Sequence, residues 1–115
     1  MMPTAIYEPY TIIVVPFPFT DKSTSKRRPA LIISQEDYQR SNSHVICLMI
    51  TSAKHSAWFG DYEIQNLAQT GLKVRSIVRQ KMFALDQRLI VKQMGLLTKK
   101  DISNVQVALK DSIGL

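Results

Sequence analysis

The apolar residues of this chain lie in short runs that are interrupted by proline, glycine or polar segments. The runs are rich in β-branched residues, as in Ile12-Ile13-Val14-Val15, and none approaches the ~20 apolar residues that a membrane-spanning helix needs. Short β-branched runs bounded by turn signals predict buried strands. We expect strands at residues 12–15, 30–33, 44–50, 58–64 (broken near Gly60), 74–85 and 89–97.

The connections between these runs have their own signals. Residues 16–19, Pro-Phe-Pro-Phe, should end regular pairing, because proline offers no N–H to a sheet. Residues 20–27 are polar and basic, which predicts a loop. Ser34, with Asp37 three residues on, is placed to cap a short helical turn through Tyr38.

The last segment changes period. Thr98 followed by Asp101 resembles a capping box at the start of a helix. Apolar residues then recur at helical spacing, at Ile102, Val105, Leu109 and Ile113. We therefore expect a mainly β domain with some α: a small barrel or curled sheet with a C-terminal helix packed on it.

The length, 115 residues with no linker or repeat, predicts a single domain over residues 1–115. With 45% hydrophobic residues, such a domain can build a core without disulfides, and the one cysteine, Cys47, can form no internal disulfide. Its place within an apolar strand favours a buried side chain over a nucleophile. The first residues show no signal peptide, so we expect a cytoplasmic protein.

Positive charge is concentrated in two short stretches. The net charge is +6, of which residues 22–28 contribute +4 and residues 73–92 contribute +5, while the rest of the chain sums to −3. If the two stretches meet in space, the fold carries one basic face, which favours a polyanion such as nucleic acid.

Familiar catalytic motifs are missing from the sequence. It has no glycine-rich phosphate loop, and its two histidines, His44 and His55, lack the carboxylate cluster of a metal site. We expect neither a metal nor a cofactor.

Two segments could nonetheless present functional groups. Arg28 lies where the basic loop meets a core strand, and Pro29 biases it toward an extended backbone. A guanidinium held there is well matched to a phosphate. Thr51 and Ser52 follow directly on an apolar strand, where a scaffold can hold hydroxyls in fixed geometry, although such residues also commonly cap turns.

Five segments in order resemble the PemK/MazF toxin family. They are VVPFPFTD (14–21), KRRPALIIS (26–34), ITS (50–52), SIVR with KMFALD (76–79 and 81–86), and MGLLT (94–98) leading into the final helix. The resemblance implies an SH3-like β-barrel with a C-terminal helix, of the PemK/CcdB type, that works as a homodimer. It also implies the toxin of a type II toxin–antitoxin pair, neutralised by an acidic antitoxin.

The activity implied by this resemblance is metal-independent cleavage of single-stranded mRNA at short sequences. The arginine and threonine of the family motifs fall on Arg28 and Thr51, our candidate catalytic residues. Attack by the RNA 2′-hydroxyl would leave a 2′,3′-cyclic phosphate, with Arg28 stabilising the charge that develops. The candidate RNA-binding residues are Thr20, Lys22, Lys26, Arg27, Ser52, Arg79 and Lys81.

The sequence departs from the family pattern at three places. Tyr10-Thr11 stand where many members have Gly-Asp, and Gln80-Lys81 follow Arg79 where some have an acid. In the loop before Arg28, residues 22–26 (Lys-Ser-Thr-Ser-Lys) lack the acid that several members carry. The base that accepts the 2′-hydroxyl proton is not identified, although His55 is a candidate. Phe17 and Phe19 could stack bases, but core packing is the alternative.

Two other functions fit the same residues. A toxin of this fold can instead inhibit a protein such as DNA gyrase, which would rely on the C-terminal helix more than on Arg28 and Thr51. A non-catalytic nucleic-acid-binding domain would show salt-dependent binding without product.

Overall fold

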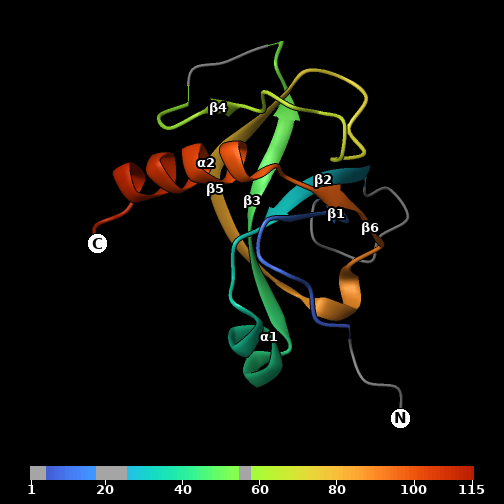
Figure 1. Cartoon of the computed structure of the whole chain (residues 1–115). Helices are drawn as coiled ribbons and strands as arrows, with labels where there is room; N and C mark the ends of the chain where they lie inside the picture. Colours follow the sequence, from blue (N-terminus) through green and yellow to red (C-terminus); the bar gives the residue numbers. More distant parts are fainter. Residues whose placement is uncertain (1–4, 18–25, 55–57) are drawn as a thin grey trace.

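The computed structural model describes residues 5–17, 26–54 and 58–115, which form an antiparallel six-stranded sheet and two α-helices (Figure 1). The spatial order of the strands is β4 (Tyr62–Glu63), β5 (Ser76–Asp86), β3 (His44–Ser52), β2 (Lys26–Ile32), β1 (Thr11–Phe17) and β6 (Lys92–Leu96). The helices are α1 (Glu36–Asn42) and α2 (Lys99–Ser112), and a 3₁₀ turn, Gln87–Leu89, follows β5. The predicted class, mainly β with a C-terminal helix, is confirmed.

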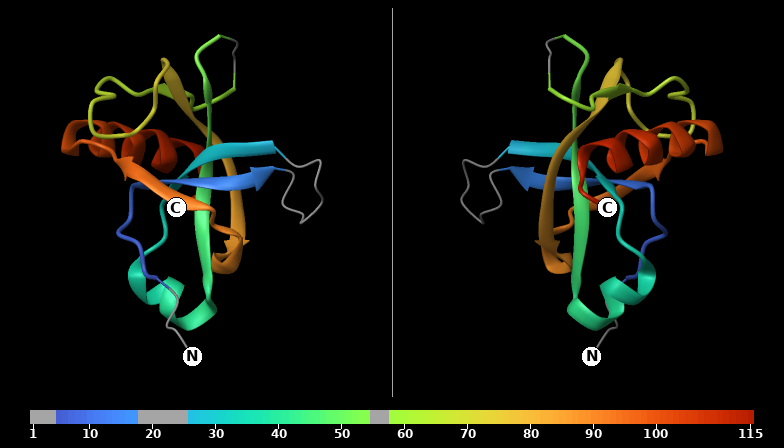
Figure 2. Two further views of the ribbon diagram at one scale, coloured as in Figure 1. Left: turned by 90° about the vertical axis from the view of Figure 1, so that its right-hand side faces the viewer. Right: turned by 90° about the vertical axis from the view of Figure 1, so that its left-hand side faces the viewer.

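The sheet curls into a half-barrel, so that β1 and β2 cross the direction of β3 and β5 (Figure 2). Both of its faces are covered by apolar packing. One core cluster lies against α2 and contains Ile12, Leu31, Leu48, Ile50, Ile64, Val78, Leu97 and Val105. The other contains Ile13, Val15, Ala30, Ile32, Val45, Cys47 and Leu85. Burial of both faces explains why the strand sequences are continuous apolar runs without polar alternation.

Helix α2 begins as the sequence predicts. The Thr98 side chain accepts a hydrogen bond from the Asp101 backbone N–H, which satisfies one of the unpaired donors of the first turn. Val105 is fully buried against the sheet, with Ile102 and Leu109 packed beside it. Ile113 lies just beyond the helix and is exposed, so the apolar stripe is one residue shorter than predicted.

Three local predictions were wrong. Pairing of β1 continues through Pro16 to Phe17, which faces Lys26, so β2 begins inside the predicted loop. Ser34 does not cap α1; its hydroxyl accepts from the Ile46 N–H, and the helix begins after Gln35 without a side-chain cap. Residues 58–61 form a turn closed by the Asp61 N–H to Trp58 C=O bond, so the strand expected at 58–64 contains only Tyr62–Glu63.

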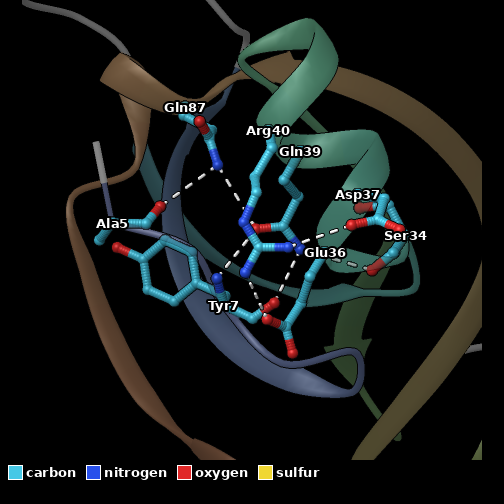
Figure 3. Close-up of polar contacts among 8 residues, drawn as sticks. All are labelled: Ala5, Tyr7, Ser34, Glu36, Asp37, Gln39, Arg40 and Gln87. Carbon is cyan, nitrogen blue, oxygen red and sulfur yellow. Dashed lines mark hydrogen bonds and ion pairs between the residues drawn. The ribbon is translucent and has the colours of Figure 1, made fainter. Parts of the chain in front are cut away.

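A buried glutamine ties the N-terminal segment to α1 (Figure 3). The Gln39 side-chain oxygen accepts from the Tyr7 N–H at 2.9 Å, and its nitrogen donates to the Tyr7 carbonyl at 2.7 Å. Gln87 donates to the same Gln39 oxygen and to the Ala5 carbonyl. Gln39 is 0% exposed, so its amide replaces the pairing that a neighbouring strand would give to this segment.

Candidate functional site

An open hollow lies where the ends of the β1–β2 hairpin and of β3 meet the middle of β5. It has a volume of about 200 Å³ and is lined by Phe17, Arg28, Met49, Ile50, Thr51, Arg79 and Lys81. Both predicted catalytic residues, Arg28 and Thr51, therefore line the same hollow, together with two of the predicted RNA-binding residues, Arg79 and Lys81.

The strands fix where Arg28 and Thr51 sit. Arg28 pairs with Val15 across the hairpin, at the exposed end of β2 and two residues before the buried Ala30. Thr51 is half-buried near the end of β3 and faces Ile77 of β5. Arg28 forms no ion pair with a carboxylate of the described residues, and it lines the hollow.

A bulge in β5 brings Lys81 to the site. Leu48 of β3 faces Met82, but the next residue, Met49, faces Arg79, so Gln80 and Lys81 have no partner on β3. Extra residues of this kind bend a strand and redirect its side chains, and they are common beside active sites. Here the bulge allows both Arg79 and Lys81 to line the hollow.

Arg79 is held by a carboxylate from another segment. Asp61 accepts from Arg79 Nε at 3.1 Å and from Nη2 at 3.0 Å, and the two side chains are 15% and 21% exposed. This hydrogen bonding raises the pKa of Arg79. No acidic residue directly follows Arg79 in the sequence, but the fold brings Asp61 into contact with it. The sequence predicts that Arg79 binds the RNA backbone, whereas in the structure its guanidinium is paired with Asp61.

The other predicted RNA-binding residues are spread around the hollow. Lys26 and Arg27 are exposed in β2, facing Phe17 and Pro16. Ser52 lines a neighbouring hollow, with Ala53, Lys54, Val74 and Arg75. Thr20, Lys22, Phe19 and His55 lie outside the described residues.

Sequence reasoning missed Trp58 and Asp61. The Trp58 ring centroid lies 5.8 Å from both Arg79 Cζ and Lys81 Nζ, and its indole N–H donates to the Gln80 carbonyl at 3.2 Å. The two residues were hidden within a predicted strand. A tryptophan in a polar segment followed by Gly60-Asp61 would have indicated a functional loop instead.

The remaining candidate groups do not join this site. Burial raises the pKa of the Cys47 thiol to about 12, so it is an apolar core side chain as predicted. His44 lies at the start of β3, with Nδ1 2.8 Å from the Asn42 carbonyl.

In the described ranges, no three His, Cys, Asp or Glu side chains group as a metal site would require. None of the helices found there is long and apolar enough to cross a membrane.

Comparison with known proteins identifies a family. The sequence model of the PemK-like, MazF-like toxins of type II toxin–antitoxin systems matches residues 8–113. No curated protein matches the chain in sequence.

Several solved structures share the fold. MazF from Deinococcus radiodurans is 18% identical, with a TM-score of 0.74 over 96% of this chain and 99% of that one. An endoribonuclease from a mycobacterial species, solved with its cognate antitoxin, is 14% identical, with a TM-score of 0.76 over 95% and 96%. The Mycobacterium tuberculosis toxin MazF-mt6 is 17% identical, with a TM-score of 0.71 over 89% and 94%.

Proposed function

The chain belongs to the PemK-like, MazF-like toxin family of type II toxin–antitoxin systems, and from that premise we propose that residues 1–115 are one toxin domain with endoribonuclease activity on single-stranded mRNA. The observation that carries the proposal is the shared hollow of Arg28 and Thr51, with Lys81 beside them. A phosphate entering it meets a guanidinium, a hydroxyl and an ammonium from three different strands.

The proposed reaction uses the RNA as its own nucleophile. The 2′-oxygen attacks the adjacent phosphorus while its proton leaves to a base, and the bond from phosphorus to the 5′-oxygen breaks as that oxygen gains a proton. The products are a 2′,3′-cyclic phosphate and a 5′-hydroxyl. In the proposal, the positive charge for this step comes from side chains, without a metal ion.

Arg28 has the role of stabilising the phosphorane. Its guanidinium is uncompensated by a described carboxylate and sits on a strand, so it needs little reorganisation as negative charge develops. Removing one preorganised donor of this kind costs on the order of 10²–10³ in rate. Thr51 orients the 2′-hydroxyl or donates to a phosphate oxygen. Neither residue suits the role of base, because a guanidinium keeps its proton and an unactivated hydroxyl is a weak acceptor.

Lys26, Arg27 and Lys81 have the role of gripping the RNA backbone. All three are exposed and none forms an ion pair within the described ranges. Each phosphate contact contributes about 0.7 to the slope of log affinity against log salt for a single strand. Replacing each in turn by alanine should flatten the slope by about that amount.

We assign the same face to an antitoxin. A partly disordered acidic segment would cover these cations and block RNA. The structurally similar mycobacterial endoribonuclease was solved in complex with its cognate antitoxin, which supports a partner of that kind. The proposal includes a cytoplasmic homodimer. Size measurement in solution, with and without an acidic protein encoded beside the gene, tests both associations.

Purified protein incubated with a long RNA and EDTA tests the activity. We expect fragments with 5′-hydroxyl ends, mapped to one short sequence, and loss of at least 10²-fold in rate for Arg28→Ala and a smaller loss for Thr51→Ala. Arg88→Ala is the matched control, since Arg88 is exposed and pairs with Asp86 at the far end of β5. Intact RNA after incubation with folded wild-type protein would refute nuclease function, and normal rates in both variants would refute the assigned site.

A further inference from the structure

The turn formed by Trp58, Phe59, Gly60 and Asp61 is fastened to β5 beside the hollow. Asp61 binds the Arg79 guanidinium through both oxygens, and the Trp58 indole N–H donates to the Gln80 carbonyl. Gly60 has φ +84°, and a Cβ there would lie 2.6 Å from Gln80 Cγ and from Ser112 Oγ. The turn is therefore wedged between β5 and the end of α2, and it can hold a side chain in one place.

That turn presents an unusually open aromatic surface. Trp58 is 45% exposed and Phe59 is 75% exposed, although side chains of this size generally bury most of their area. The only polar atom of the indole already has its partner, so what Trp58 offers to solvent is ring surface. A fixed, exposed ring with a satisfied N–H is suited to stacking and not to hydrogen-bonded readout.

The ring also lies at the edge of the candidate catalytic hollow. Lys81 Nζ and Arg79 Cζ are each 5.8 Å from its centroid, and both residues line the hollow with Arg28 and Thr51. A strand of RNA whose phosphate sits in the hollow would have a neighbouring base within reach of the indole. Single-stranded nucleic acids are commonly bound by this combination of a cationic track and an aromatic platform.

We propose that Trp58 is the stacking platform for one unpaired base of the RNA next to the phosphate held at Arg28. This inference rests on the proposed nuclease function and adds a binding residue to it. Stacking accepts any base, so Trp58 contributes affinity and positions the strand rather than reading its sequence. Asp61 is a positioning residue that keeps the turn against Arg79.

Trp58 is the single tryptophan of the chain, so its fluorescence reports on this site alone. We would titrate wild-type protein with a short, end-labelled, fully 2′-O-methylated RNA of randomised sequence, which cannot be cleaved by 2′-oxygen attack. Anisotropy of the label gives the affinity, and tryptophan emission gives stacking. We expect quenching that saturates with the anisotropy change.

Three variants separate stacking from a structural role. Trp58→Leu should weaken binding about fivefold to a hundredfold, and Trp58→Phe, which keeps a ring but loses the N–H bond to Gln80, should stay within a few-fold of wild type. A merely structural role of the indole N–H would impair Phe and Leu alike. Tyr38→Leu is the aromatic control and should leave binding unchanged. Tyr38 lies on α1, which is at the start of β3, whereas the hollow is at the other end of that strand (Figure 1).

The outcomes also distinguish this inference from the proposed function. RNA cleavage with no quenching and normal affinity in Trp58→Leu would overturn the stacking role and leave the nuclease intact. Quenching by an acidic peptide but not by RNA would assign the ring to a protein partner and overturn it as well. A wild-type protein that neither binds nor cleaves RNA would overturn both.

Discussion

The Tyr62 hydroxyl donates a 2.6 Å hydrogen bond to Oδ1 of Asp101, which joins the two-residue strand β4 to the first turn of α2. Asp101 is 0% exposed and also accepts from the backbone N–H groups of Gln65 and Asn66 and from the Thr98 hydroxyl. One buried carboxylate therefore holds the helix, β4 and the segment after it together, on the side of the sheet behind the candidate site.

Asp101 should make stability depend on acidity. Burial is the largest influence on its pKa and raises it, but the hydrogen bonds from Tyr62, Gln65, Asn66 and Thr98 together lower the pKa below its ordinary value. A carboxyl whose pKa is lower in the folded state than in the unfolded state adds to the free energy of unfolding. The contribution is complete at a pH above the unfolded-state pKa of about 3.9, and it is lost as the pH falls through the folded-state pKa.

Urea unfolding of Asp101→Asn between pH 7 and pH 3 measures this contribution. We expect a loss of about 1–3 kcal/mol at pH 7, since an amide cannot accept all of these bonds, and a difference from wild type that shrinks below about pH 4. Asp111→Asn, exposed on the same helix, should change little. A difference that stays constant down to pH 3 would contradict the linkage.

The start of α2 illustrates what local sequence can and cannot predict. Thr98 caps the helix as its spacing with Asp101 predicts, because that bond is made within one turn. The bonds that the Asp101 carboxylate accepts from Tyr62, Gln65 and Asn66 come from residues more than 30 positions away, which no local pattern reveals. The strands, like the Thr98 cap, could be predicted from local sequence, since continuous apolar runs indicate strands that are buried on both faces.

The candidate site likewise has features that the local sequence predicts and features that it does not. Arg28 and Thr51 could be found because each is a polar residue next to the end of an apolar strand. The bulge at Gln80-Lys81 and the pairing of Arg79 with Asp61 could not, because both depend on the register between distant segments. The local apolar spacing predicted a strand through Trp58. The structure has a turn there instead, because Trp58 and Asp61 bind to Gln80 and Arg79 of β5.

Asp61→Asn should loosen that turn. The substitution removes the charge that faces the mostly buried Arg79, and breaking such a pair, with some solvent screening, should cost about 1–2 kcal/mol of unfolding free energy. Emission from Trp58 should shift to longer wavelength as the indole becomes more hydrated. Glu63→Gln breaks the more exposed pair with Arg75, which solvent screens, and should cost clearly less than Asp61→Asn. Equal losses in the two variants would argue against a special role for the Asp61 pair.

Gln39→Leu should release the N-terminal segment. The apolar side chain leaves the Tyr7 N–H and carbonyl without their partner, at a cost of about 2 kcal/mol. Amide hydrogen exchange at Tyr7 should accelerate far more than at Val45 in the core. Gln35→Leu is the control, because Gln35 is exposed and makes no side-chain cap bond. Unchanged protection of Tyr7 would show that Gln39 does not hold this segment.

Gly95→Ala should be among the most damaging single-methyl changes in the chain. A Cβ at Gly95 would lie 2.3 Å from the Gln69 carbonyl oxygen and 2.6 Å from Thr70 C, both backbone atoms that cannot move aside as a flexible side chain could. The clash would separate the end of β6 from residues 69–70, where Leu96 N–H now donates to the Gln69 carbonyl. We expect a loss of about 3 kcal/mol by chemical denaturation. Gly114→Ala adds the same methyl where no atom lies within 4 Å and should change stability by less than about 0.5 kcal/mol; similar values for the two variants would mean that β6 and residues 69–70 are not in close contact.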